Sequence, residues 1–160
     1  MQPFQIRSGT ERDHDWIFGV LNEHWGSAQI VTRGTVHDAD TLPAFLAEVD
    51  NERVGLITYR FHEDQCEVVS FNSLRESIGI GTALLDAVKD AAAKAGCRRL
   101  WLITTNDNLA AIRFYQRRGW NLVAVHKGAI AESRRLKPTI PEIGINGIPI
   151  RDEIELELPL

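Results

Sequence analysis

The amino-acid sequence predicts a mixed α/β fold, with a mostly antiparallel twisted sheet that carries helices on both faces. Residues 45–74 have the pattern of three consecutive strands joined by tight turns, which predicts an antiparallel meander. Residues 66–105 have the pattern strand, helix, strand, and such a unit crosses over between parallel strands of one sheet. Because both kinds of pairing occur, the sheet is mixed, and helices are needed to cover its two faces.

The chain starts with a predicted strand at 4–7 and a helix. Thr10 can cap that helix, and Asp13 three residues later completes a capping box. Gly26 is the predicted stop. The polar stretch 27–41 predicts an irregular loop, followed by a short helical turn or the start of a strand at 42–46.

Turn residues divide the meander. Asp50 and Asn51 separate predicted strands at 45–49 and 53–61. A second tight turn is expected at 62–65. The third strand, at 66–74, is indicated by its β-branched and aromatic residues.

Helices and strands alternate after the meander. A helix over 79–95 has an apolar stripe and a C-cap at Gly96. The next segment, 98–106, is apolar almost throughout, which predicts a central strand buried on both faces. A helix at 108–118, a strand at 120–126, a short helix that includes 133–137 and a last alternating strand around 154–158 follow.

Composition restricts the classes of function. The chain has 160 residues, 44% of them hydrophobic and 25% charged, which fits one domain over residues 1–160. A formal net charge of −4 disfavours nucleic acid and anionic membranes as partners. No apolar run approaches the length of a membrane span, and the N-terminus lacks the pattern of a signal peptide. Two cysteines make no disulfide framework, so we expect a reduced, cytoplasmic protein.

Gly79 and Gly81 stand where a strand ends and a helix begins, in the stretch "SIGIG". Glycine lets the backbone approach a ligand closely, and the unpaired N–H groups of a helix start attract anions. Tight packing of helix on strand explains the glycines equally well. A dinucleotide fingerprint would place a third glycine at Leu84, and the Gly-Lys-Ser/Thr of a phosphate-binding loop is missing too, so a nucleotide-binding module is disfavoured.

Two motifs together carry a resemblance. "SLRESIGIGTALL" and "NDNLAAIRFYQRRGW" resemble the acetyl-CoA-binding motifs of the GCN5-related N-acetyltransferase (GNAT) superfamily. The second motif is matched by Asn108, Ala111, Tyr115, Gly119 and Trp120, and the resemblance covers most of residues 4–126. One position departs: Glu76 stands where the family has Gln or Arg, and the nearest arginine is Arg75.

The resemblance implies acetyl-CoA as acyl donor. It implies that backbone amides from Ser77 to Thr82 hold the pyrophosphate. Because a carboxylate beside a pyrophosphate is unfavourable, we expect Glu76 to point to solvent and Arg75 to cover the phosphates. The resemblance also implies that strands 66–74 and 98–106 splay apart, which frees a backbone N–H near Phe71 or Asn72 for the thioester carbonyl. The expected cofactor-binding residues are Phe71, Asn72, Ser73, Arg75, Ser77, Ile78, Gly79, Ile80, Gly81, Thr82, Asn108 and Tyr115.

Two residues are candidates for the chemistry. Tyr115 is the candidate acid for the leaving thiolate, because a phenol is protonated at neutral pH; a core tyrosine that packs like Phe114 is the alternative. Glu67 is the candidate base, on a strand face that alternation shares with Val69 and Phe71. A solvent-exposed carboxylate is as good an explanation of Glu67, and ordered water could carry the proton instead.

The acceptor, an amine of a small molecule or a protein, is not identified. Trp25, Arg33 and His37 are candidates for its pocket, although a core tryptophan, a solvated arginine and a surface histidine explain them more simply. His62 and Cys66 lack a second pair at zinc spacing, so no metal is expected. The terminal strand could pack on a partner subunit in a homodimer. A catalytically silent acyl-CoA-binding domain of the same fold is the alternative to an enzyme.

Overall fold

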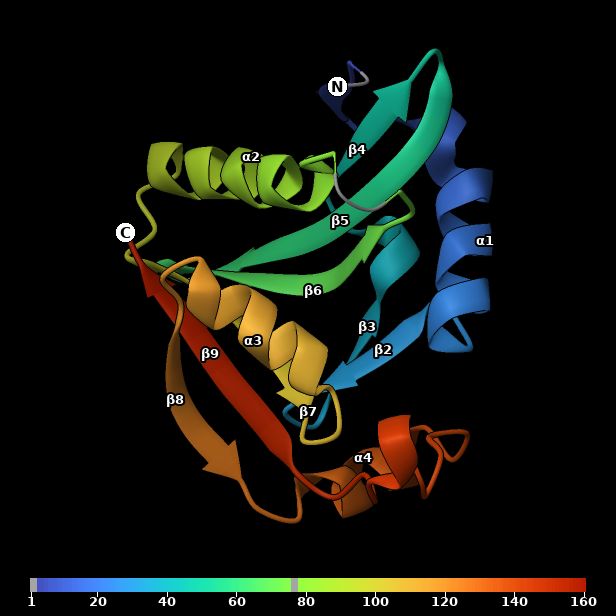
Figure 1. Ribbon diagram of the computed structural model, residues 1–160, viewed down its shortest axis with the longest axis vertical. Helices are drawn as coiled ribbons and strands as arrows, with labels where there is room; N and C mark the ends of the chain where they lie inside the picture. The colour runs from blue at the N-terminus through green and yellow to red at the C-terminus, as the bar shows by residue number, and fades with distance from the viewer. Residues whose placement is uncertain (1–2, 76–77) are drawn as a thin grey trace. The chain divides into compact units, whose positions relative to one another are not determined.

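A computed structural model describes residues 3–75 and 78–160 and confirms the mixed α/β class (Figure 1). Seven strands form a mostly antiparallel sheet, and β2 and β3 form a separate two-stranded ribbon. The backbone groups into two compact units. The first unit comprises Met1–Ile30, Asp38–Leu100 and Leu160, and the second comprises Val31–His37 and Trp101–Pro159. The single domain over 1–160 stays a prediction.

The first unit contains the predicted meander. Its strands follow the order β1-β4-β5-β6, and each neighbouring pair is antiparallel. Asp50 and Asn51 both have positive φ, at 49° and 66°, as the tight hairpin between β4 and β5 requires. The elements of this unit are β1 (Gln5–Ser8), η1 (Glu11–Asp13), α1 (His14–Trp25), η2 (Ala39–Thr41), β4 (Ala44–Val49), β5 (Glu52–His62), β6 (Gln65–Ser73) and α2 (Ile80–Lys94).

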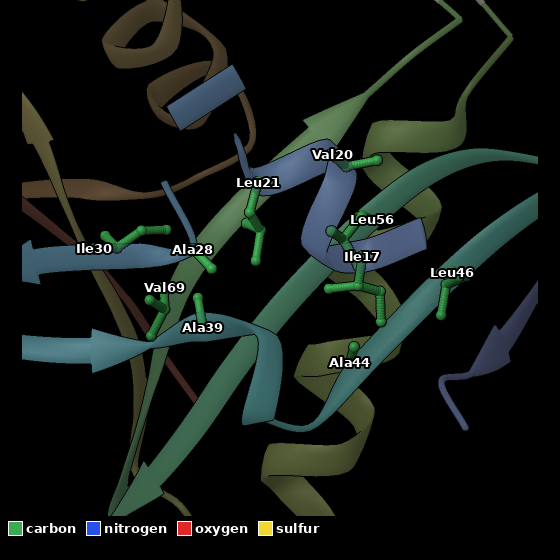
Figure 2. Close-up of a cluster of buried hydrophobic side chains, with 10 residues drawn as sticks. All are labelled: Ile17, Val20, Leu21, Ala28, Ile30, Ala39, Ala44, Leu46, Leu56 and Val69. Atoms are coloured by element: carbon green, nitrogen blue, oxygen red, sulfur yellow. The ribbon is translucent and has the colours of Figure 1, made fainter. Parts of the chain in front are cut away.

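Helices cover both faces of these strands, as the sequence predicts. Leu46 pairs with Leu56, and α1 packs on that face. Figure 2 shows this cluster, which comprises Ile17, Val20, Leu21, Ala28, Ile30, Ala39, Ala44, Leu46, Leu56 and Val69. On the other face α2 approaches so closely that a Cβ at Gly55 would lie 2.8 Å from the Cγ2 atom of Ile80. Gly55 therefore permits the packing of α2 on β5.

The capping box before α1 is confirmed, and it is part of a larger network. Asp13 accepts a hydrogen bond from the backbone N–H of Thr10 at 2.8 Å. Arg7 donates to both oxygens of the buried Asp13 carboxylate, at 2.7 and 2.8 Å, and Arg53 donates from Nε at 2.9 Å. These hydrogen bonds, led by that of Arg7, hold the pKa of Asp13 well below its usual range.

A bulge in β6 corrects the predicted face of Glu67. Ser70 pairs with Thr58, but the next pair joins Val68 to Tyr59, so Val69 is an extra residue in the ladder. An extra residue reverses the alternation beyond it. Glu67 and Phe71 therefore lie on opposite faces, and Glu67 shares its face with Ser70 and Asn72.

The second unit carries the remaining strands in the order β7-β9-β8, with β8 and β9 antiparallel. Its helices confirm those predicted at 108–118 and around 133–137. Within residues 3–75 and 78–160, no helix has the length and apolarity to cross a membrane. The elements are β7 (Arg99–Thr105), whose first two residues belong to the first unit, α3 (Leu109–Arg117), β8 (Asn121–His126), α4 (Ala129–Leu136), η3 (Ile145–Gly147) and β9 (Glu153–Pro159).

The prediction of an irregular loop over 27–41 is wrong. This stretch forms the β2–β3 ribbon, with β2 at Gln29–Thr32 and β3 at Thr35–Asp38. Arg33 and Gly34 turn the chain with φ of 48° and 75°. Four-residue strands with polar side chains carry little of the apolar alternation on which a strand prediction depends, and their pairing supplies the stability that the pattern does not reveal.

Candidate active site

The start of α2 is an open helix end. Gly79 has a φ of 89°, and none of the described side chains caps the helix there. Its first turn also contains no acidic residue. The N–H groups of a first turn have no partner within the helix and carry partial positive charge, so this end suits an anion. Of the predicted loop residues, Ser77 and its neighbour Glu76 lie outside the described residues.

Arg75 lies just before this helix start. Its Nη2 atom donates to Glu52 Oε2 at 2.8 Å, and its backbone carbonyl accepts from Ser73 Oγ at 3.0 Å. The ion pair is largely exposed, so its contribution to stability is small. The guanidinium is thus held beside the first residue of β5, and its contact with a phosphate stays a prediction.

Along β6, three polar side chains on one face each meet a partner in the first unit. Arg60 Nε donates to Glu67 Oε1 at 2.9 Å, the Ser70 and Thr58 hydroxyls lie 2.6 Å apart, and Trp25 Nε1 donates to Asn72 Oδ1 at 2.9 Å. The Glu67 side chain is 1% exposed, so its interpretation as a solvated carboxylate is wrong. The structure brings together Trp25 and Asn72, which the sequence analysis predicted for different roles, whereas Glu67, five residues before Asn72 in β6, contacts Arg60 of β5.

The start of α3 is capped by its own chain. Asn108 Oδ1 accepts a hydrogen bond from the backbone N–H of Ala111 at 3.3 Å, which confirms the predicted cap. A carbonyl oxygen has two lone pairs, so this bond is compatible with a second one.

Tyr115 has a buried ring and a protonated hydroxyl. Its side chain is 7% exposed and packs against Phe114 and Trp120, each with 5.3 Å between ring centroids. Burial raises the pKa of the phenol well above its ordinary value, and the charge of Arg118 opposes that shift. The core packing and the proton needed by an acid are therefore both present in one side chain.

Two candidates for the acceptor pocket lie in the β2–β3 ribbon, Arg33 in its turn and His37 in β3. Arg33 donates to both oxygens of Glu153, from its backbone N–H and from Nη1, each at 3.2 Å. His37 is 6% exposed, and its Nε2 atom lies 2.8 Å from Thr32 Oγ1. Arg33 is therefore paired, and the interpretation of His37 as a surface residue is wrong.

The sequence analysis did not identify the buried polar residues Asp107 and Glu153. Asp107, after β7, accepts from Thr105 Oγ1 at 2.5 Å and from the backbone N–H of Ile145 at 2.9 Å. Glu153 is 2% exposed at the start of β9. The polar run "TTNDN" (104–108), in which the strand β7 ends, was the available signal for Asp107, whereas no feature of the neighbouring sequence indicates that Glu153 is buried.

The two free cysteines are expected to be unreactive. Cys66 and Cys97 are both buried and unbonded, and burial raises the pKa of Cys66 to about 12. Because the thiolate is the reactive form, Cys66 is a poor nucleophile at neutral pH.

A model of the acetyltransferase (GNAT) family matches residues 9–120, which is more than half of the chain. The chain belongs to the GNAT acetyltransferase family. The resemblance inferred from the two motifs is thereby confirmed, and the match ends at Trp120, the last residue of the second motif.

Two proteins are similar to the chain in sequence, and a solved structure is similar to it in fold. The chain is 43% identical to the uncharacterized protein YxbD of Bacillus subtilis (strain 168) over 143 residues, covering 89% of this chain and 90% of YxbD. It is 47% identical to the uncharacterized protein YdhI of the same organism over 133 residues, covering 82% and 83%. A GNAT family acetyltransferase from Elizabethkingia anophelis with acetyl-CoA bound shares the fold, with a TM-score of 0.71, 20% identity and complete coverage of both chains.

Proposed function

We propose that this protein is an acetyl-CoA-dependent N-acetyltransferase, which transfers an acetyl group to an amine by direct attack on the thioester. The observation that carries the proposal is the uncapped start of α2, which follows the strand β6, whose polar side chains are held by Arg60 and Trp25, in a member of the GNAT family. The bound acetyl-CoA of the Elizabethkingia anophelis relative supports the choice of donor.

The proposed cofactor site combines backbone and side chains. Amides of Ser77 to Thr82, including Ile78, Gly79, Ile80 and Gly81, hold the pyrophosphate, and Arg75 contributes a positive charge. Phe71, Asn72 and Ser73 line the acyl end. Asn108 uses its second lone pair or its amide N–H to bond the pantetheine arm, beside the Ala111 N–H that it already caps.

The reaction needs three catalytic contributions from the protein. In the transfer, the amine nitrogen bonds to the acetyl carbon, the carbon–sulfur bond breaks, and the thioester supplies the acetyl group. A backbone N–H of Phe71 or Asn72 stabilises the carbonyl oxygen as negative charge develops on it. Glu67, or ordered water beside it, accepts the proton of the amine, and the Tyr115 hydroxyl donates a proton to the sulfur.

Trp25 makes the acyl end of the proposed cofactor site rigid through a hydrogen bond to Asn72. The indole N–H holds the Asn72 side chain at 2.9 Å, so the last residue of α1 fixes a residue of β6. We assign Trp25, Arg33 and His37 to the acceptor side of the site. The acceptor class, small molecule or protein, is to be found by experiment.

Two measurements test the proposal. Isothermal calorimetry should detect coenzyme A binding, and coenzyme A should raise the melting temperature because it binds the folded state. A screen of amines that follows thiol release from acetyl-CoA should then find an acceptor. No coenzyme A binding at millimolar concentration would overturn the proposal, whereas tight binding without turnover of any amine would favour a silent acyl-CoA-binding domain.

A further inference from the structure

A pocket in the second unit is lined by basic side chains. It has a volume of about 350 Å³, within the range of small-ligand sites, and it lies where β8 leads into α4. Its lining comprises Lys127, Gly128, Ala131, Arg134, Arg151 and Asp152. All six lie beyond residues 9–120, and none belongs to the set proposed for acetyl-CoA.

The residues that line the pocket carry a net positive formal charge, in a chain whose net charge is −4. Lys127, Arg134 and Arg151 face one carboxylate, that of Asp152, which leaves a surplus of two positive charges. In the described part of the chain, none of the three cations forms an ion pair, whereas Arg33, Arg60 and Arg75 each do. Three cations that form no ion pair within the described residues therefore line a single cavity.

Arg134 is held in place without being neutralised. Its Nε atom donates to the carbonyl of Ile140 at 3.3 Å, and Nη2 donates to the carbonyls of Pro141 and Ile150 at 2.7 and 2.8 Å. These contacts leave Nη1 without a partner among residues 3–75 and 78–160. A guanidinium fixed by carbonyls keeps its charge and loses little entropy when it binds an anion.

The backbone N–H groups at the start of α4 are not what attracts an anion to this pocket. The N–H of Gly128 donates to Asp152 Oδ1 at 2.8 Å, and that of Ile130 donates to the carbonyl of Arg151 at 3.1 Å. Two amides at this helix start are thus already occupied. Recognition depends on the three side-chain cations, which approach the cavity from α4 and from the segments before α4 and β9.

We infer that this pocket binds the phosphate group of a small phosphomonoester. A phosphomonoester carries about −1.5 to −2 charges at pH 7, which matches the surplus of two positive charges. Its oxygens suit the planar forks of two guanidinium groups, and a lysine ammonium adds a point charge. The inference rests on the residues of this pocket and does not depend on the proposed acetyl transfer.

The pocket is also tied to the start of α3. Asn106 Oδ1 accepts from the backbone N–H groups of Arg151 and Asp152, at 2.9 and 3.0 Å. Asn106 lies two residues before the cap Asn108. A phosphate that orders the Arg151–Asp152 wall would therefore also order the turn that carries Asn108.

The test is a calorimetric titration with inorganic phosphate at constant ionic strength. The measurement is made on Gly81→Glu and on wild type saturated with coenzyme A, so that the α2 end does not contribute. Lys127→Gln and Arg151→Gln should each raise the Kd about tenfold or more, because hydrogen bonds to charged groups are worth about 1.5–3 kcal/mol.

Arg135→Gln is the matched control. It also removes one positive charge, from the helix that carries Arg134 of the lining, but Arg135 is 77% exposed, pairs with Glu132 and lies outside the pocket lining. We expect an unchanged Kd. Absence of phosphate binding in both background proteins, or an equal loss in Arg135→Gln and the two pocket variants, would overturn the inference. Failure of coenzyme A to bind would instead bear on the acetyltransferase proposal alone.

Discussion

The starts of α2 and α3 differ in how their backbone N–H groups are used. α2 begins after Gly79, and no described side chain caps it. α3 begins after Asn108, whose side chain accepts from Ala111. An uncapped end offers its amides to a ligand, whereas a capped end makes the helix a rigid support for its side chains. We therefore propose that α2 binds an anion through its backbone and that α3 supplies the Tyr115 side chain for the chemistry.

The largest expected effect tests the role of α3. Tyr115→Phe removes one hydroxyl and keeps the packed ring, so coenzyme A affinity and folding should be preserved. Turnover should fall about 10²- to 10⁴-fold, the usual scale for a general acid. Steady-state thiol release with the acceptor found by the screen measures this loss.

The other tyrosine provides a matched control. Tyr59 is also buried, lies in β5 of the first unit and has no proposed role in the reaction. Tyr59→Phe should leave turnover unchanged. Equal rates for Tyr115→Phe and wild type would remove Tyr115 from the mechanism.

The next effect tests the open end of α2. Gly81→Glu places a carboxylate in the first turn, where it would repel a pyrophosphate. Coenzyme A affinity should fall at least about 100-fold, because juxtaposed like charges cost several kcal/mol. Gly19→Glu adds the same charge at an open position of α1 and should bind coenzyme A like wild type. Normal binding by Gly81→Glu in calorimetry would contradict the assignment of the phosphates to α2.

A smaller effect separates the two roles of Asn108. Asn108→Ala removes the cap and should lower the free energy of unfolding by about 1 kcal/mol. Asn108→Ser restores a capping oxygen, so it should recover most of that loss in urea denaturation. If Asn108 also bonds the pantetheine arm, both variants should bind coenzyme A more weakly. Full affinity in Asn108→Ser would limit the residue to capping.

The smallest effect is a change of stability with pH. The folded state raises the pKa of Tyr115 above its ordinary value of 10.0, so above about pH 10 the unfolded chain loses this proton first. The stability that Tyr115 contributes is therefore complete below that pH and is lost as the pH rises toward its folded pKa. Urea titrations between pH 8 and 11 should show a shallower decline for Tyr115→Phe than for wild type. Parallel declines would mean that the phenol does not resist ionisation.

Much of the fold could be predicted because its signals are local. Thr10 and Asp13 mark the start before α1, Asp50 and Asn51 mark a hairpin, and Gly119 follows α3 with a φ of 88°. Each signal is a hydrogen bond or a backbone angle within a few residues. The sequence did not predict the β2–β3 ribbon, because the ribbon is stabilised by strand pairing and burial. Neither can be recognised in its polar sequence.

The sequence by itself determined the family and the two motifs, since these are short runs of residue types at fixed spacing. Only the tertiary structure decided the partners of the site residues. Glu67 lies buried beside Arg60, Trp25 bonds Asn72, and Arg33 pairs with Glu153 across 120 positions of chain. A bulge of one residue in β6 placed Glu67 and Phe71 on opposite faces. Such contacts depend on strand register and on segments far apart in the chain, and neither periodicity nor spacing within one segment contains that information.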